Sequence, residues 1–229
     1  MKVADSLLSK SNFLRASKQL QKVIKSSPDY LPARLGYANA LESLAGDKKK
    51  NVKEITLAYV EAAKVALTQD PRMDYVSSAA GDGGLAEAFL NHALMFAKNA
   101  PKKDRLEIYN SLISAAHTGS FAADAYYHLG VELLSVSSES SSMNVDYRPA
   151  IHAFRTANQY ASLITGNEGK GHGKSLVQLA KVGLLASQDK MQVQTILQRA
   201  LACSLDEVTK SEALLLLDQT KSVRLHFQF

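Results

Sequence analysis

The feature that most constrains this chain is a spacing of small and bulky apolar residues that occurs twice, far apart in the sequence. Each time, a small residue is followed four positions later by a bulky one, and three positions after that by another small or apolar residue. Residues three and four apart lie on one face of an α-helix, where alternating sizes let a second helix pack closely. The spacing predicts repeated, packed helices. The two occurrences are Ala16, Leu20 and Val23, followed by Pro28, and Ala150, Phe154 and Ala157.

Another helix is expected ahead of the later occurrence and in the segment after Pro28. In each place one residue is followed three or four positions later by a pair of adjacent residues. A leucine follows three positions after that pair, so all of them share one face of a helix. The two sets are Tyr126, Leu129, Gly130 and Leu133 in the later segment, and Ala33, Tyr37, Ala38 and Leu41 in the earlier one.

Taken together, these residues resemble the tetratricopeptide repeat, whose motif reads W-x2-L-G-x2-Y, then A-x3-F, then P, over about 34 residues. Leu129-Gly130 and Phe154 match the motif, as do Ala16 and Pro28. Trp is absent from the chain, and Arg34 and Tyr126 stand in its place. The resemblance implies an all-α fold, an α-α superhelix in which antiparallel helix hairpins stack as a solenoid.

We expect residues 1–229 to form one such domain. The hairpins that contain Ala38 and Gly130 depart from the motif in the same way. Ala58 and Ala150 each follow twenty residues later, where the motif has about twelve. In the second of these insertions, residues 135–142 are rich in serine and too polar to pack. The expected helix pairs span 2–27, 31–69, 84–117, 123–162 and 174–202, with a short helix at 72–79 and a capping helix at 206–220.

The two ends of the stack have their own features. If Ala16 opens the second helix of a repeat, Leu7 and Leu8 end the first, and that helix begins part-way through the motif. This suits either a short natural cap or a chain cut from a longer one. At the other end, the Leu214 to Leu217 run should cover the last repeat, because terminal repeats need such a cover.

The charge pattern favours a solvated surface. The formal net charge is +5, and the lysines are scattered apart from runs at 48–50 and 102–103. No aromatic residues alternate with them, as single-strand binding requires, so we expect no nucleic-acid binding. The lone Cys203 excludes an intramolecular disulfide, and its leucine and alanine neighbours suggest a core thiol in a reducing compartment.

No apolar run approaches the ~18 residues of a membrane span. The first residues, Met-Lys-Val-Ala-Asp-Ser, show no apolar core of a signal peptide. We therefore expect no membrane span and a cytoplasmic protein.

Catalytic and cofactor motifs are not found. Residues 169–175, Gly-Lys-Gly-His-Gly-Lys-Ser, end like a phosphate-binding loop, but the glycines are too close together and a helix, not a strand, precedes them. A flexible connection with Ser175 near a helix start is the simpler interpretation. The six histidines show no zinc-site spacing; His92 and His128 fit core or groove positions. The serine tract either accepts phosphate or is an unmodified turn. We expect no metal, no cofactor and no enzymatic activity.

The resemblance also implies a concave groove lined by the first helix of each repeat, suited to a peptide or a partner helix. Its lining positions correspond to Pro32, Leu35, Asn39, Glu42 and Ser43 in the earlier repeat, and to Asp124, Tyr127, Val131, Leu134 and Ser135 in the later one. Chaperone-binding members of the family hold a carboxylate with a lysine where this chain has Leu35. We therefore expect an apolar or mixed peptide. The candidate site residues are Leu35, Asn39, Glu42, Tyr127, Val131 and Leu134.

Two functions follow from this interpretation. The first is a non-catalytic interaction module or scaffold that binds a protein or peptide partner. The alternative is the substrate-positioning repeat portion of a larger enzyme, because residues 32–41 and the lysine-rich turn after them resemble the repeat region of aspartyl/asparaginyl β-hydroxylases. No sequence feature fixes an oligomeric state.

Overall fold

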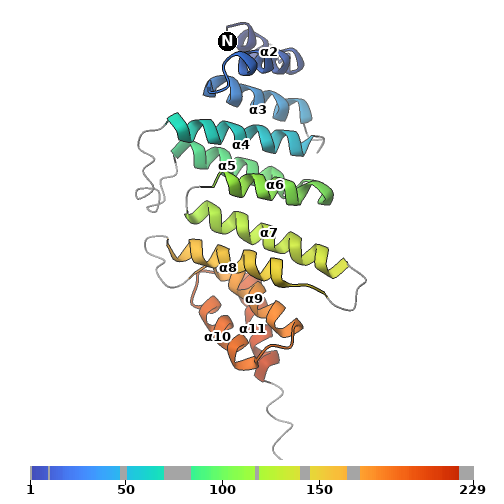
Figure 1. The fold of residues 1–229 in the computed structure, drawn as a ribbon, viewed down its shortest axis with the longest axis vertical. Helices are drawn as coiled ribbons and strands as arrows, with labels where there is room; N and C mark the ends of the chain where they lie inside the picture. Colours follow the sequence, from blue (N-terminus) through green and yellow to red (C-terminus); the bar gives the residue numbers. More distant parts are fainter. Residues whose placement is uncertain are drawn as a thin grey trace, which may run out of the picture. The chain divides into compact units, whose positions relative to one another are not determined.

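The part of the chain that the computed structural model describes is entirely helical. It comprises residues 2–9, 11–46, 51–69, 84–116, 119–139, 145–163 and 171–221, and no strand occurs among them. The expected all-α class is confirmed. The described helices, shown in Figure 1, are α1 Lys2–Ser9, α2 Phe13–Ser26, α3 Leu31–Ala45, α4 Val52–Gln69, α5 Gly84–Ala97, α6 Lys102–Ser114, α7 Gly119–Glu139, α8 Arg148–Ser162, α9 Gly173–Leu185, α10 Lys190–Leu201 and α11 Glu207–Lys221.

Local sequence explains where several helices begin. The side chains of Asn12, His172 and Asp189 accept hydrogen bonds from backbone N–H groups in the first turns of α2, α9 and α10. Such caps satisfy donors that have no partner inside the helix. Pro32 and Pro149 lie in the first turns of α3 and α8, where the missing N–H costs nothing.

The helix bounds differ from the expected ones by a few residues, for example at both ends of α7, which was expected over 123–136. We expected a serine stretch too polar to pack from residue 135, but α7 continues to Glu139. Within this last part, the Ser137 hydroxyl donates to the carbonyl of Leu133 at 2.9 Å and lies 3.1 Å from that of Asp146. Intrahelical bonding of this kind lets serine stay helical. The helix expected at 72–79 lies outside the described residues.

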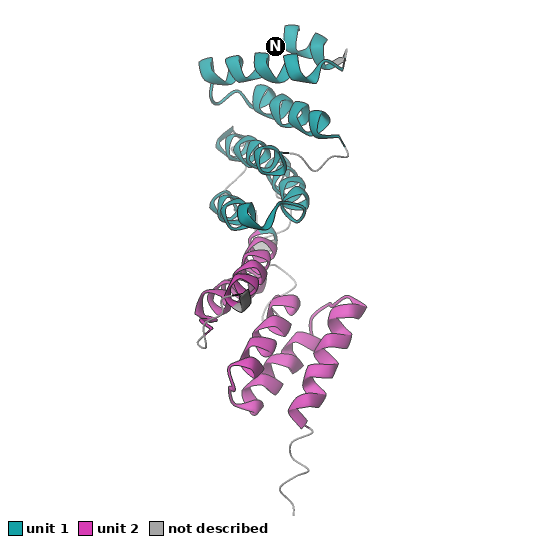
Figure 2. Cartoon of the chain, turned by 90° about the vertical axis from the view of Figure 1, so that its right-hand side faces the viewer, with its two compact units in different colours: residues 1–78, 82–121 teal, residues 79–81, 122–229 magenta. Residues whose placement is uncertain are grey.

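The chain divides into two compact units, coloured in Figure 2. Unit 1 comprises residues 1–78 and 82–121, and unit 2 comprises residues 79–81 and 122–229. In unit 1, α2 packs against α1 and α3, and α4 packs against α3, α5 and α6. In unit 2, α9 packs against α8, α10 and α11. Most of these packed pairs are consecutive helices, as in helical hairpins, while α4 with α6 and α9 with α11 pack across an intervening helix. The single domain expected over the whole chain stays a prediction.

Small side chains make the helix contacts, as the opening spacing predicted. In unit 1, Ala16, Leu20, Ala33 and Ala40 are fully buried in one cluster that also includes Ala4. In unit 2, the same is true of the α8 residues Ala150, Phe154 and Ala157, each 0% exposed. Alanine lets two helix backbones approach closely, which explains how a chain with few aromatic residues fills its core.

Part of the predicted end cover is wrong. Leu216 is buried, and Leu217 packs against the same core cluster of unit 2. Leu214 and Leu215 are 50% and 60% exposed, because residues two apart face opposite sides of a helix. Cys203 is half-buried, and it packs against this cluster. Among the described helices, none is long and apolar enough to cross a membrane.

Candidate functional site

The predicted groove residues of the earlier repeat lie on one face of α3. Leu35 and Glu42 are half-buried and Asn39 is exposed. At about 100° per residue, the three fall within about 60° of one another around the helix. The face was expected from the motif, but the side chains that complete it come from α4 and α5.

Tyr59 of α4 joins Asn39 to Glu42. Its hydroxyl oxygen lies 2.5 Å from the Glu42 carboxylate and 2.7 Å from the side-chain oxygen of Asn39. Burial raises the pKa of the Tyr59 phenol above its usual value, and the hydrogen bond to Glu42 raises it further. The phenol is therefore protonated at neutral pH and donates to the carboxylate.

His92 of α5 bonds to the same carboxylate oxygen of Glu42 as Tyr59 does. Its Nε2 lies 3.0 Å from Glu42 Oε2, and the two side chains are 40% and 37% exposed. The His92 ring meets the Tyr59 ring edge to face at 4.6 Å between centroids, and Phe96 at 5.3 Å. We call Asn39, Glu42, Tyr59, His92 and Phe96 the Glu42 cluster.

α5 presents exposed apolar side chains on the side of the helix that carries His92. Leu85 and Met95 are each 64% exposed and lie within about 60° of His92 around the helix. A half-exposed carboxylate next to exposed apolar groups can accept a hydrogen bond from a partner while its neighbours bury apolar surface. We call Leu35, Asn39, Glu42, Leu85, His92 and Met95 the α3–α5 face.

The predicted residues of the later repeat lie in unit 2, on one face of α7. Tyr127, Val131 and Leu134 are all half-buried. The Tyr127 ring lies 6.2 Å from the ring of the buried Phe154 and 5.4 Å from that of His172. Burial raises the pKa of the Tyr127 phenol. Tyr127 is thus part of the packing of unit 2, and a charge introduced there would disturb the fold as well as any groove.

His172, the N-cap of α9, also joins two residues in a way that the spacing did not show. Its Nδ1 lies 2.7 Å from Ser175 Oγ and 3.3 Å from the Ser175 backbone nitrogen, while its Nε2 lies 3.3 Å from Asp124 Oδ1. Because Nδ1 accepts from the backbone N–H, Nε2 carries the ring proton and donates to Asp124. Asp124, His172 and Ser175 therefore bond in the order of a hydrolytic triad, but with the two ring nitrogens exchanged.

The burial of Ser175 argues against that chemistry. Ser175 is 0% exposed, whereas an attacking hydroxyl must come within about 3–3.5 Å of the substrate carbon. The three residues fix the first turn of α9 to α7. Sequence spacing could not reveal them, because Asp124 and His172 are 48 residues apart and such triads are recognised by geometry.

The two glycines on either side of His172 have no room for a side chain. A Cβ on Gly171, whose φ is +87°, would lie 2.0 Å from the Asn158 side-chain oxygen, and one on Gly173 would lie 2.5 Å from Leu205. The expected helix start near Ser175 is confirmed. The His172 backbone N–H donates to the Asn158 side-chain oxygen of α8 at 3.2 Å, and the Cys203 thiol lies 3.7 Å from the Gly171 carbonyl oxygen. The expected flexibility of this connection stays a prediction. Residues 164–170 lie outside the described part.

No group of three or more His, Cys, Asp or Glu that could hold a metal ion occurs in the described part of the chain. No protein-family model matches the sequence, and no curated protein is significantly similar to it.

Proposed function

We propose that this protein is a non-catalytic interaction module of the tetratricopeptide type, which holds a peptide or helix of a partner protein on the α3–α5 face. The single observation that carries the proposal is the Glu42 cluster. It holds a half-exposed carboxylate through Tyr59 and His92, and Leu85 and Met95 are exposed on the side of α5 that carries His92.

The chemistry of this face supports a mixed ligand. Leu85 and Met95 offer apolar surface, which a partner gains free energy by covering. Methionine adapts to different ligand shapes. Glu42 has no proton to donate when ionised, so it selects a donor, such as a lysine, arginine or amide side chain. A segment with apolar residues flanking one such donor fits best.

Two methionines provide a matched test. Met95 and Met191 are both 64% exposed, and Met191 lies on α10 in unit 2. The partner is first captured from a lysate on the parent protein, and Met95→Glu is then compared with Met191→Glu for its retention. We expect Met95→Glu to lose most of the partner and Met191→Glu to keep it, with both variants retaining the helical circular dichroism of the parent.

Two results would count against the α3–α5 face. Equal retention by both variants would move the binding site elsewhere. Loss on Met191→Glu alone would assign it to unit 2.

A further inference from the structure

A second surface lies on unit 1, away from the α3–α5 face. Four cationic side chains of α2 follow one another at intervals of three, four and three residues, and all four are exposed. At about 100° per residue they fall within about 80° around the helix, and at about 1.5 Å per residue they extend over about 15 Å. We call them the basic stripe: Arg15, Lys18, Lys22 and Lys25.

The basic stripe is not neutralised within the fold. α2 contains no Asp or Glu, and among the described residues no ion pair involves any of the four cations. Like charges three and four residues apart repel one another and destabilise a helix. A partner that brings carboxylates to this face would relieve that repulsion, so the charge complementarity points to an acidic ligand.

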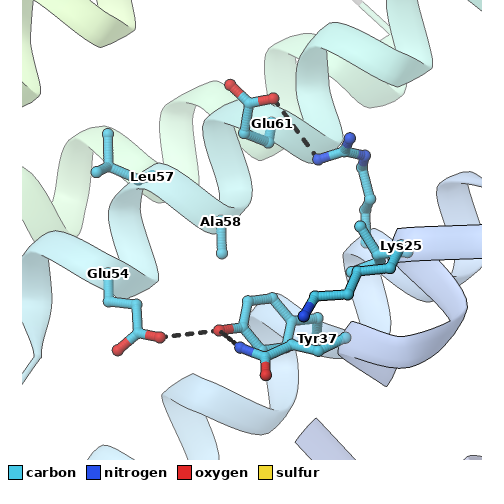
Figure 3. Close-up of a pocket in the computed structure, with 9 residues that line it drawn as sticks. Lys25, Tyr37, Glu54, Leu57, Ala58 and Glu61 are labelled. Carbon is cyan, nitrogen blue, oxygen red and sulfur yellow. Dashed lines mark hydrogen bonds and ion pairs between the residues drawn. The ribbon is translucent and has the colours of Figure 1, made fainter. Parts of the chain in front are cut away.

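A pocket of about 450 Å³ adjoins the C-terminal end of the stripe (Figure 3). Lys25 belongs to both, and Ile24, Leu57 and Ala58 give the pocket an apolar lining. The pocket is formed by residues of α2, α3 and α4, namely Gln21, Ile24, Lys25, Arg34, Tyr37, Glu54, Leu57, Ala58 and Glu61.

The two carboxylates of the pocket already have partners. Tyr37 donates to Glu54 at 2.8 Å and accepts from Gln21 at 2.7 Å. Glu61 is paired with Arg34 at 3.6 Å and with Lys64 at 2.9 Å. The walls are therefore polar but balanced in charge, and the apolar lining between them suits an uncharged side chain.

We propose that the basic stripe and this pocket together bind an acidic segment of a partner protein, with several Asp or Glu residues along the stripe and one bulky apolar side chain in the pocket. The site is separate from the α3–α5 face, because Tyr37 and Asn39 are two residues apart and thus point about 160° away from each other around α3.

A peptide fits the pocket better than the other polyanions do. Single-stranded nucleic acid binds through bases stacked on aromatic rings. Tyr37 is the one aromatic residue lining the pocket, and its hydroxyl is bonded to Gln21 and Glu54. An anionic membrane attracts basic side chains through its surface charge, and this attraction needs no pocket for a side chain. A linear row of cations beside one apolar pocket fits a peptide, which carries acidic and apolar side chains along one backbone.

The experiment uses the full chain and a labelled synthetic peptide with glutamates at three- and four-residue spacing and one terminal phenylalanine. Binding is followed by fluorescence anisotropy, with a second peptide in which serine replaces phenylalanine. Phosphatidylserine vesicles and an oligothymidylate serve as the other two probes. We expect the phenylalanine peptide to bind about tenfold more tightly than the serine peptide, and more tightly than either other probe.

Two sets of variants test the two halves of the site. The double variant Lys18→Glu with Lys22→Glu should bind the phenylalanine peptide about tenfold more weakly, because attraction to the glutamates becomes repulsion at two positions. The control, Lys98→Glu with Lys210→Glu, makes the same charge change at exposed lysines elsewhere and should change the affinity less than about twofold. Ala58→Leu fills the pocket and should make the two peptides bind equally.

Three outcomes would overturn the proposal. The first is equal binding of both peptides by the parent protein. The second is equal loss in the Lys18/Lys22 variant and its control. The third is preferential binding of the vesicles or the oligonucleotide, which would assign the stripe to a membrane or to nucleic acid.

Discussion

Gly130 offers the sharpest test of the helix packing in unit 2. The motif places a small residue here, and the structure shows why: a Cβ added to Gly130 would lie 2.6 Å and 2.7 Å from two ring carbons of Phe154. Ordinary carbon contacts are about 3.5–4.0 Å, so the ring would have to withdraw by about 1 Å. Phe154 is fully buried, so this movement must displace other core side chains.

The expected cost of Gly130→Ala follows from two opposing terms. Alanine is favoured over glycine inside a helix by about 1 kcal/mol, while overpacking a filled core costs about 1–3 kcal/mol. Contacts this short place the second term near its upper end. We expect a net loss of about 2 kcal/mol in the free energy of unfolding, measured by urea denaturation followed by circular dichroism.

Gly36 provides the control for this substitution. A Cβ there meets only Leu20, at 3.4 Å, so Gly36→Ala should be neutral or stabilise by up to about 1 kcal/mol. Replacing Phe154 with leucine should reduce the additional cost of Gly130→Ala, since contacting residues are not additive. If Gly130→Ala is as stable as Gly36→Ala, or its cost is unchanged in the Phe154→Leu background, the packing argument is wrong.

Three further substitutions or probes test individual interactions. Tyr59→Phe should cost about 1 kcal/mol at neutral pH through the lost hydrogen bond to Glu42. Because the fold raises the Tyr59 pKa, the stability that the phenol contributes is complete below pH 10 and falls as the pH rises further; unfolding curves at increasing alkaline pH should show a smaller loss for Tyr59→Phe than for the parent. Ser175 should remain unlabelled by a serine-reactive fluorophosphonate in the folded protein, and labelling there, detected by mass spectrometry, would contradict its structural role. Gly171→Ala should lower the thermal midpoint strongly, since both its positive φ and the contact with Asn158 oppose a side chain; an unchanged midpoint would show that this turn can rearrange freely.

Periodicity and small-residue spacing were sufficient to predict most helices. Ala16 and Phe154 are buried as expected because residues three and four apart share a helix face whatever the tertiary arrangement. The end of α7 was missed because serine composition does not show that Ser137 can bond back to its own helix.

The candidate sites were predictable only one helix at a time. The α3 spacing placed Asn39 and Glu42 on one face, but their connection through Tyr59 depends on how α4 packs against α3. The same holds for His172 and Asp124, which meet across 48 residues of chain. Pairings of this kind depend on the packing of whole helices, and a local pattern does not contain that information.

The central claim, that a partner segment lies on the α3–α5 face, can be tested by placing a photo-crosslinking amino acid at Ser43. Ser43 is exposed on α3, and its hydroxyl bonds only to the backbone of its own helix in the described structure. Ser114, exposed at the end of α6 and bonded to its own helix in the same way, is the matched control. After irradiation with the captured partner, we predict a covalent adduct from position 43 and none from position 114. An adduct from position 114 alone, or none from position 43 while the partner remains bound, would contradict the proposal.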